Sequence, residues 1–318
     1  MGRAVSAVAT KPRLGFLGVG WIGRSRLEEI ERSRVAEIAA IADPAVVGSV
    51  GSLDELLRLG LDGLVIATPS ALHADQAEAA LSAGLAVFCQ KPLGLNAAET
   101  AAVVRTARIA DRLLGVDLSY RSTAAAQAVR ELVRTGAVGE VFAADLTFHN
   151  AYGPDKPWFY DPTLSGGGCL IDLGIHLVDL ALWTLDWPRV QAVRAWLRGK
   201  PVEDYAVAEL ELASGARVRI ACSWNLHTGT DAVIDLAFHG SDGGATLRNV
   251  GGSFYEFVAE RYVGRERQVV VEPPDEWFGR AAVEWAARVA AGERYDPEIE
   301  RVVEVAEVLD ELYRSAAR

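Results

Sequence analysis

The stretch RLGFLGVGWIG, residues 13–23, decides the first half of the fold. Its apolar start at 13–17 predicts a short strand that runs directly into a glycine turn of the pattern G-x-G-x-x-G. A helical pattern follows, and a second apolar strand at 37–42 ends at Asp43, 20 residues after Gly23. This order of elements predicts a dinucleotide-binding unit. The turn residues expected at the dinucleotide are Gly18, Gly20, Trp21, Ile22 and Gly23.

Asp43 bears on the choice of dinucleotide. A carboxylate at the end of the second strand binds the adenosine ribose hydroxyls and repels the 2′-phosphate of NADP. The next residues, 44–47, are Pro, Ala, Val and Val and supply no cation for that phosphate. The sequence therefore favours NAD over NADP. The alternative is a tight turn beside an unrelated surface carboxylate, which the ordered context disfavours.

Strand and helix patterns continue to alternate up to residue 121. Apolar runs at 64–68, 86–90 and 116–119 predict three more buried parallel strands. The residues expected to cap the intervening helices are Ser52, Ser70 and Asn96. Five such strands describe a doubly wound sheet, whose ligands bind at the carboxyl ends of the strands. Lys91 follows the fourth strand, so we expect its amine over a nicotinamide; a surface lysine at a sheet edge is the alternative.

Strand patterns dominate the second half, after a helix at 124–134. Their period-two alternation is typical of a large antiparallel sheet with one solvated or interface face. The predicted strands span 140–150, 190–197, 205–212, 216–224, 232–239, 245–248, 255–263 and 268–271. Helices at 276–291 and 297–315 end the chain. The predicted units are a leader at 1–12, a dinucleotide-binding domain at 13–121 and an α+β substrate and oligomerisation domain at 122–318.

Composition narrows the class of protein. The 318 residues carry a net charge of −11, with a pI near 5.1, which disfavours nucleic-acid and anionic-membrane partners. No apolar run approaches the ~18 residues of a membrane span, and residues 1–12 read as a disordered leader without a secretory core. Three scattered cysteines, Cys89, Cys169 and Cys222, favour a cytoplasmic location over a disulfide framework. We expect no bound metal.

A narrow polar stripe marks the apolar stretch 170–182. Read as a helix, this stretch is apolar or glycine except at Asp172, His176 and Asp179, which their spacing places on one face. Such groups need a polar partner, because burying them unpaired is costly. The glycines at 166–168 let a backbone or a ligand approach the helix start. Asp172 and His176 form a candidate acid/base pair, and Asp179 is interpreted as structural; the alternative is the wet edge of a buried helix.

Together these motifs resemble the Gfo/Idh/MocA oxidoreductases, relatives of glucose–fructose oxidoreductase and inositol dehydrogenase. The resemblance covers nearly the whole chain after residue 11 and rests on 18–23, 67–73, 90–92, 120–121 and 166–179. It implies a Rossmann domain followed by an α+β domain with an open antiparallel sheet. It also implies catalytic positions at Lys91, Asp172 and His176. The further residues that it places at the cofactor are Thr68, Pro69, Ser70, His73, Gln90 and Arg121.

One position departs from the family pattern. The family usually has Glu-Lys-Pro where this chain has Gln90, Lys91 and Pro92. Glutamine keeps the hydrogen-bonding shape of glutamate but loses its charge. The change bears on how the cofactor is held more than on the chemistry.

The chemistry predicted is NAD-dependent oxidation of a secondary alcohol, or the reverse reduction of a ketone. His176 takes the hydroxyl proton, because an imidazole serves as base or acid near neutral pH. Lys91 donates to the same oxygen and stabilises its developing charge. Asp172 holds either His176 or a neighbouring substrate hydroxyl.

The substrate class follows from the loop at 151–165. Trp158 and Phe159 offer flat faces that pack on sugars, and Lys156 is the loop's one cation, which favours a neutral sugar, polyol or sugar lactone. Two alternatives stay open, namely glycoside cleavage with retained NAD and a non-catalytic NAD-sensing regulator. A homodimer or homotetramer is expected, because the later helices are too few to cover both faces of the sheet.

Overall fold

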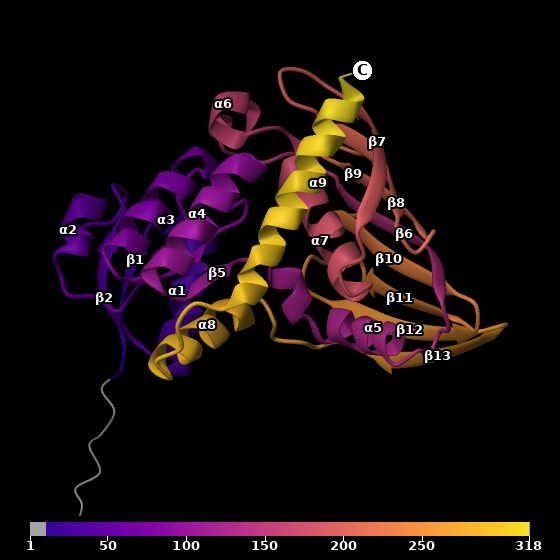
Figure 1. Ribbon diagram of the computed structural model, residues 1–318, viewed down its shortest axis with the longest axis horizontal. Helices are drawn as coiled ribbons and strands as arrows, with labels where there is room; N and C mark the ends of the chain where they lie inside the picture. Colours follow the sequence, from indigo (N-terminus) through magenta and orange to yellow (C-terminus); the bar gives the residue numbers. More distant parts are fainter. Residues whose placement is uncertain (1–10, 318) are drawn as a thin grey trace, which may run out of the picture.

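The computed structural model describes residues 11–317, so most of the leader expected at 1–12 lies outside the described residues. Within this range two sheets organise the chain (Figure 1). The first has five strands in the order β2-β1-β3-β4-β5, and the second has eight in the order β13-β12-β11-β10-β6-β9-β8-β7. This confirms the predicted fold class, a Rossmann sheet followed by a larger sheet.

The first sheet pairs all of its strands in parallel, as an alternating strand–helix pattern requires. Its strands are β1 Arg13–Leu17, β2 Glu37–Ala42, β3 Gly63–Ile66, β4 Ala86–Cys89 and β5 Leu114–Val116. The helices between them are α1 Trp21–Ser33, α2 Leu53–Leu57, α3 His73–Ser82 and α4 Ala97–Ala110. The side chains of Ser52 and Asn96 accept the N–H groups three residues later, at 3.3 and 2.9 Å, which confirms two predicted caps.

Two local predictions in this sheet are wrong. Ser70 begins a short 3₁₀ turn rather than capping a helix, and the N-cap of α3 is Leu72. The fifth strand ends at Val116 instead of residue 119, because the N–H two residues later donates back to its carbonyl at 2.8 Å. Asp117 therefore lies just past the strand, at the edge of the sheet where ligands bind.

The second sheet is mixed, whereas the sequence predicted an antiparallel one. Its strands are β6 Val141–Asn150, β7 Val190–Arg198, β8 Tyr205–Leu212, β9 Arg217–Ser223, β10 Ala232–Gly240, β11 Gly244–Asn249, β12 Phe257–Val263 and β13 Glu266–Val271. Strands β6 and β9 pair in parallel, and the other neighbours are antiparallel. The cause is the long helical connection after β6, which returns the chain to the same end, so that β7 and β9 run in the direction of β6.

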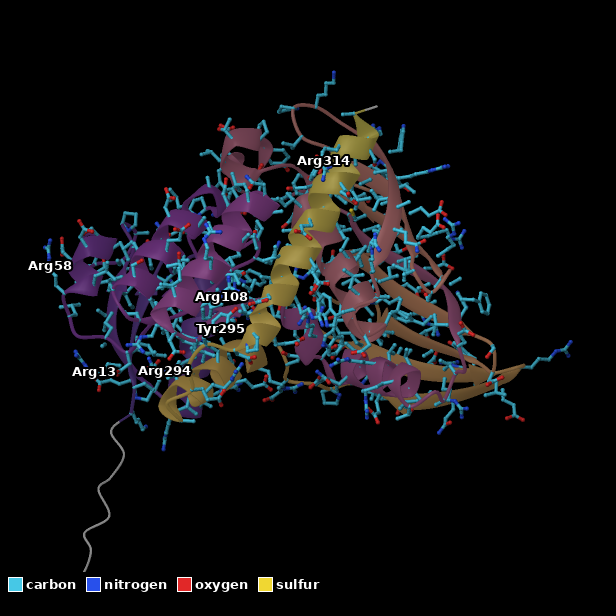
Figure 2. The ribbon with its side chains drawn as sticks, in the orientation of Figure 1. Arg13, Arg58, Arg108, Arg294, Tyr295 and Arg314 are labelled. Atoms are coloured by element: carbon cyan, nitrogen blue, oxygen red, sulfur yellow. The ribbon has the colours of Figure 1, made fainter. Side chains whose placement is uncertain are left out.

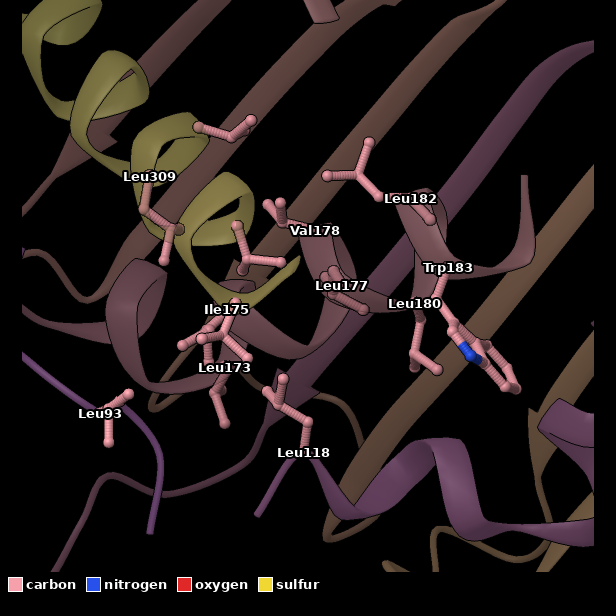
Figure 3. Packing of buried hydrophobic residues seen from close by; sticks show 14 of the residues in the cluster. Leu93, Leu118, Leu173, Ile175, Leu177, Val178, Leu180, Leu182, Trp183 and Leu309 are labelled. Carbon is pink, nitrogen blue, oxygen red and sulfur yellow. The ribbon is translucent and has the colours of Figure 1, made fainter. Parts of the chain in front are cut away.

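Three helices cover one face of this sheet (Figure 1), namely α5 Ala124–Arg134, α7 Ile175–Thr184 and α9 Arg301–Ala316. Helix α7 is buried along its whole length, and Figure 3 shows Val178, Leu182 and Trp183 within the hydrophobic cluster. The stretch Pro162–Thr184 is long and apolar enough to cross a membrane by composition, but 83% of its apolar window is buried. It packs as the core helix of the second domain.

The predicted boundary at 121/122 places both C-terminal helices in the second domain, but only α9 packs there. Helix α8, Arg280–Ala290, packs on the first sheet, where the Trp285 ring lies 5.6 Å from that of Phe88. Polar pairs secure the chain after α8 to α4: Arg294 contacts Asp111, and Arg108 contacts Glu300 at 3.3 Å (Figure 2). The reason is the apolar face of α8, which is buried only against the parallel sheet.

Candidate functional site

The glycine turn is shaped to receive a dinucleotide. Helix α1 begins after Gly20, which supplies no side-chain cap, so the first N–H groups of the helix stay available for a phosphate. A Cβ on Gly23 would lie 2.3 Å from the carbonyl of Gly18, and Gly18 itself has a φ of +83°. A Cβ on Gly20 would meet no atom within 4 Å and would instead occupy open space in front of the helix. These residues fit a pyrophosphate held by backbone amides.

Asp43 lies beside this turn at the end of β2. Its Oδ2 accepts the Val19 N–H at 2.7 Å, and its Oδ1 accepts the Ala45 N–H at 2.8 Å. The carboxylate is thereby oriented toward the turn, in the position that the adenosine ribose of a bound dinucleotide requires.

A cavity of about 960 Å³ runs from the glycine turn to the second sheet. It is lined by nearly every residue that the sequence assigned to the site. From the first domain these are Gly18, Gly20, Trp21, Ile22, Gly23, Asp43, Thr68, Pro69, Ser70, His73, Gln90 and Lys91; from the second they are Trp158, Phe159, Asp172 and His176. The structure therefore brings the predicted cofactor and substrate residues to one cleft between the two domains.

Arg121 is the exception, since the structure does not bring it to this cavity. Its Nε donates to Asp179 at 2.8 Å, and its guanidinium lies 5.1 Å from the ring of Trp187. Burial raises the pKa of Asp179, and the charge of Arg121 opposes that shift. Asp179 is thus structural, as expected, but its partner comes from the connection after β5 and not from its own helix.

Lys91 and Asp172 meet across the cleft. The Nζ of Lys91 lies 2.5 Å from Oδ1 of Asp172 and 2.8 Å from its backbone oxygen. The other carboxylate oxygen, Oδ2, accepts the indole N–H of Trp224 at 3.1 Å. Of the two partners that the sequence left open for Asp172, His176 is not the one that its carboxylate contacts within residues 11–317, where its oxygens contact Lys91 and Trp224. Because each carboxylate oxygen can accept a second hydrogen bond, contact with a substrate hydroxyl stays a prediction.

His176 lies one turn further along, in a buried aromatic setting. Its ring is 6% exposed and packs edge-on against Tyr120 at 4.9 Å, with Phe148 on another side. Within residues 11–317 its Nδ1 has no hydrogen-bond partner. Burial first, and then the charge of Lys91, hold the pKa of His176 well below its usual range. The imidazole is therefore neutral at pH 7 and can accept a proton.

The helix that carries these groups starts differently from the prediction. Leu170–Gly174 form a wide π-helical turn, and α7 begins only at Ile175. Just before it, a Cβ on Gly168 would lie 1.9 Å from the carbonyl oxygen of Glu203. The carboxylate of Glu203 accepts the N–H groups of Gly168 and Leu170, each at 2.9 Å. The glycines thus make room for a backbone, and a protein carboxylate occupies the helix start.

His73 and Gln90 line the cavity with their polar groups already engaged. The ring nitrogens of His73 face the carbonyl oxygens of Pro92 and Thr68, at 2.7 and 2.8 Å. Gln90 donates to Asp117, whose Oδ2 also accepts the Nε of Arg26 at 2.6 Å. Both residues therefore fix the chain around Lys91.

Sequence reasoning missed several residues of the cavity. They are Arg26, Asp117, Tyr120, Phe148, Asn150, Tyr152, Phe254, Tyr255, Trp277 and Phe278. Most lie on strand ends or connections that fold next to the cleft from distant parts of the chain. Asn150 ends β6 at a polar break in the buried face formed by Ala144, Leu146 and Phe148, which was a usable signal. Its Oδ1, like Oδ1 of Asp117, is buried without a partner in the described chain.

Hydride transfer needs a nicotinamide at the carboxyl edge of the first sheet and an acid/base group facing it, and this cavity provides a place for both. A cavity with a place for the nicotinamide and for a facing acid/base group is typical of NAD-dependent oxidoreductases, and we assign the protein to this class. Among residues 11–317 no group of three or more His, Cys, Asp or Glu could hold a metal ion.

Comparison with known proteins identifies the family. Residues 12–118 match the oxidoreductase family with an NAD-binding Rossmann fold, and residues 126–246 match the GFO/IDH/MocA C-terminal domain. A D-xylose 1-dehydrogenase (NADP⁺) of Haloferax volcanii is 31% identical over 320 residues, which cover 95% of this chain and 96% of the relative. The chain belongs to the Gfo/Idh/MocA oxidoreductase family.

Two further proteins illustrate the likeness. The D-glucoside 3-dehydrogenase of Escherichia coli K12 is 27% identical over 276 residues, covering 76% of this chain and 79% of the relative. The crystal structure of GenD2, from gentamicin A biosynthesis, in complex with NAD superposes with a TM-score of 0.82 at 25% identity. That match covers 100% of this chain and 97% of the other.

Proposed function

We propose that the protein oxidises a secondary hydroxyl of a neutral sugar or polyol with NAD, or reduces the corresponding ketone. The observation that carries this proposal is the convergence of Lys91, Asp172 and His176 on the cavity that begins at the glycine turn. A regulator that only senses NAD has no need for a half-buried lysine–carboxylate pair beside a neutral imidazole.

The side chains divide the proton chemistry among them. The chemistry that bound NAD supplies is hydride acceptance in one direction and hydride donation in the other. His176, held neutral by burial, takes the hydroxyl proton in oxidation and returns it in reduction. Two of the three N–H groups of Lys91 point to Asp172, which leaves the third for the substrate oxygen and its developing negative charge.

The walls of the cavity support a neutral, hydroxyl-rich substrate. Trp158 and Phe159 both line the cavity and stack on each other with their centroids 3.8 Å apart, so the aromatic faces that they can offer a sugar are the outer ones of the pair. Asn150 presents a buried amide oxygen that can accept a hydroxyl hydrogen bond. Lys156, the cation of this loop, also lines the cavity, but its charge is paired there with that of Asp155 at 3.3 Å. The relatives named above include dehydrogenases of D-xylose and D-glucosides, which agrees with this class.

The test is to incubate the pure protein with NAD and a panel of neutral sugars and polyols while following the absorbance of reduced nicotinamide. His176→Asn should lower kcat about 10²–10⁴-fold, and His239→Asn, on the surface, serves as the matched control. Turnover that requires no His176, or NAD binding without turnover of any substrate, would contradict the proposal. Product formed without a net absorbance change would instead indicate NAD-assisted cleavage.

We also infer a homodimer or homotetramer, and a cytoplasmic location. The uncovered face of the second sheet carries a large exposed side chain, that of Trp196, at 58% exposure. Trp196 lies opposite the exposed Val207 on the next strand, and the two side chains form an apolar patch on this face. Three buried free cysteines suit a reducing compartment, and fractionation of the native host's cells tests that location.

A further inference from the structure

Helix α9 packs against both domains next to the catalytic cleft: it contacts α4 of the first domain and α7 of the second. Its apolar face packs where the segment after Lys91 meets the start of α7, as Leu309, Leu93 and Ile175 show (Figure 3). The space left between these elements is only about 30 Å³. A displacement of α9 therefore moves both the strand end that carries Lys91 and the helix that carries His176.

Two polar side chains of α9, three residues apart, hold these two segments. Asp310 Oδ2 accepts the N–H of Ala97 at 3.1 Å, at the first residue of α4 and six residues after Lys91. The Tyr313 hydroxyl donates to Oε1 of Glu203 at 2.7 Å. The two anchors thus join the cofactor domain to the second domain through one rigid helix.

Glu203 passes the contact on to the catalytic turn. Its Oε1 accepts three hydrogen bonds, from the Tyr313 hydroxyl and from the amides of Gly168 and Leu170. Glu203 is only 6% exposed, so these donors take the place of the water that its carboxylate loses on burial. Asp172 follows two residues after Leu170, and its backbone oxygen and carboxylate both contact Lys91.

We propose that Tyr313 and Glu203 are positioning residues that place Asp172 and His176 against Lys91 across the cleft. The inference rests on the proposed function, since it assigns these groups to the handling of the substrate hydroxyl. Tyr313 and Glu203 do not line the cavity and act only through the turn at 168–172. Their loss costs turnover rather than cofactor affinity, because small displacements of reacting groups lower rates steeply.

Tyr313→Phe tests this directly, because it removes only the hydroxyl. The variant should lower kcat about 10-fold or more while leaving the Kd for NAD unchanged. Tyr295→Phe is the matched control, since that tyrosine also donates to a glutamate, Glu300 at 2.6 Å, outside the cleft (Figure 2). Glu203→Gln, which keeps the acceptor oxygen, should retain more turnover than Glu203→Ala. Equal kcat values for the two tyrosine variants would overturn the proposal.

Hydrogen exchange supplies a readout that needs no activity. The amides of residues 166–176 should exchange faster in Tyr313→Phe than in Tyr295→Phe. The first domain should melt at the same temperature in both variants. Unchanged exchange in this segment would refute the positioning role even if no substrate is found. Absence of turnover in the wild type with altered exchange would contradict the proposed function alone and leave the positioning of the turn supported.

Discussion

At the scale of single residues, Asp43 sets the cofactor preference. Its carboxylate lies at the glycine turn, and the residues after it offer no cation for a 2′-phosphate. Asp43→Ser should weaken NAD binding about 10-fold and narrow the gap to NADP, because it removes the ribose partner and the repulsion together. Titration of both cofactors measures this, with Asp54→Ser on the surface of α2 as control. Tighter NADP binding by the wild type would contradict the assignment.

His176 determines how the reaction responds to pH. A general base must be unprotonated, and burial lowers the pKa of this imidazole well below the ordinary 6.5. The kcat/KM for alcohol oxidation should therefore stay level as the pH falls through 6.5 and decrease only at lower pH. A pH series of initial rates checks this. An acidic limb centred at 6.5 or above would show that the base is a different group, or that His176 is solvated.

The glutamine at position 90 is explained by its neighbours Asp117 and Arg26 as well as by the cofactor. It donates to Asp117, a buried carboxylate that Arg26 already neutralises. Gln90→Glu places a second carboxylate there and should destabilise the protein by roughly 1–3 kcal/mol at pH 7. Adding Asp117→Asn exchanges the two groups and should restore the melting temperature. If Gln90→Glu has the same melting temperature as the wild type, the charge of Asp117 does not require a neutral side chain at position 90.

At the scale of elements, the close approach of the Glu203 backbone explains the glycine at position 168, just before the π-helical turn Leu170–Gly174. A Cβ at Gly168 would meet the backbone of Glu203, which has no room to move. Gly168→Ala should therefore lower the free energy of unfolding by roughly 1–3 kcal/mol and lower kcat as well. Gly51→Ala is the control, because its Cβ would face only the flexible side chain of Glu55 at 3.0 Å. Thermal melts compare the two, and equal stability would refute the close contact.

At the scale of the whole molecule, the open face of the second sheet predicts self-association. Trp196→Glu should convert an oligomer into monomers, because it places a charge in the apolar patch of Trp196 and Val207 that a second copy would cover. Ile109→Glu, at an exposed position on α4, is the matched control and should leave the assembly unchanged. Light scattering at micromolar concentration measures both. A monomeric wild type would contradict the prediction.

The sequence alone determined what depends on neighbours along the chain. Alternating patterns predicted the strands of both sheets, and the spacing from Gly23 to Asp43 predicted the dinucleotide turn. The caps at Ser52 and Asn96 were predicted equally well, because a capping hydrogen bond spans only three residues. The stripe of Asp172 and His176 also pointed correctly at the cleft, since helical periodicity is a local property.

Tertiary structure decided which partner each of these groups has. Asp172 contacts Lys91, 81 positions away, instead of His176, and Arg121 pairs with Asp179 instead of lining the cavity. The parallel pairing of β6 with β9, the return of α8 to the first sheet and the contact of Glu203 with Gly168 were equally out of reach of local patterns. The physical reason is that such contacts depend on where a connection returns the chain and on which buried charge finds a donor, and both are set by the packing of the whole molecule.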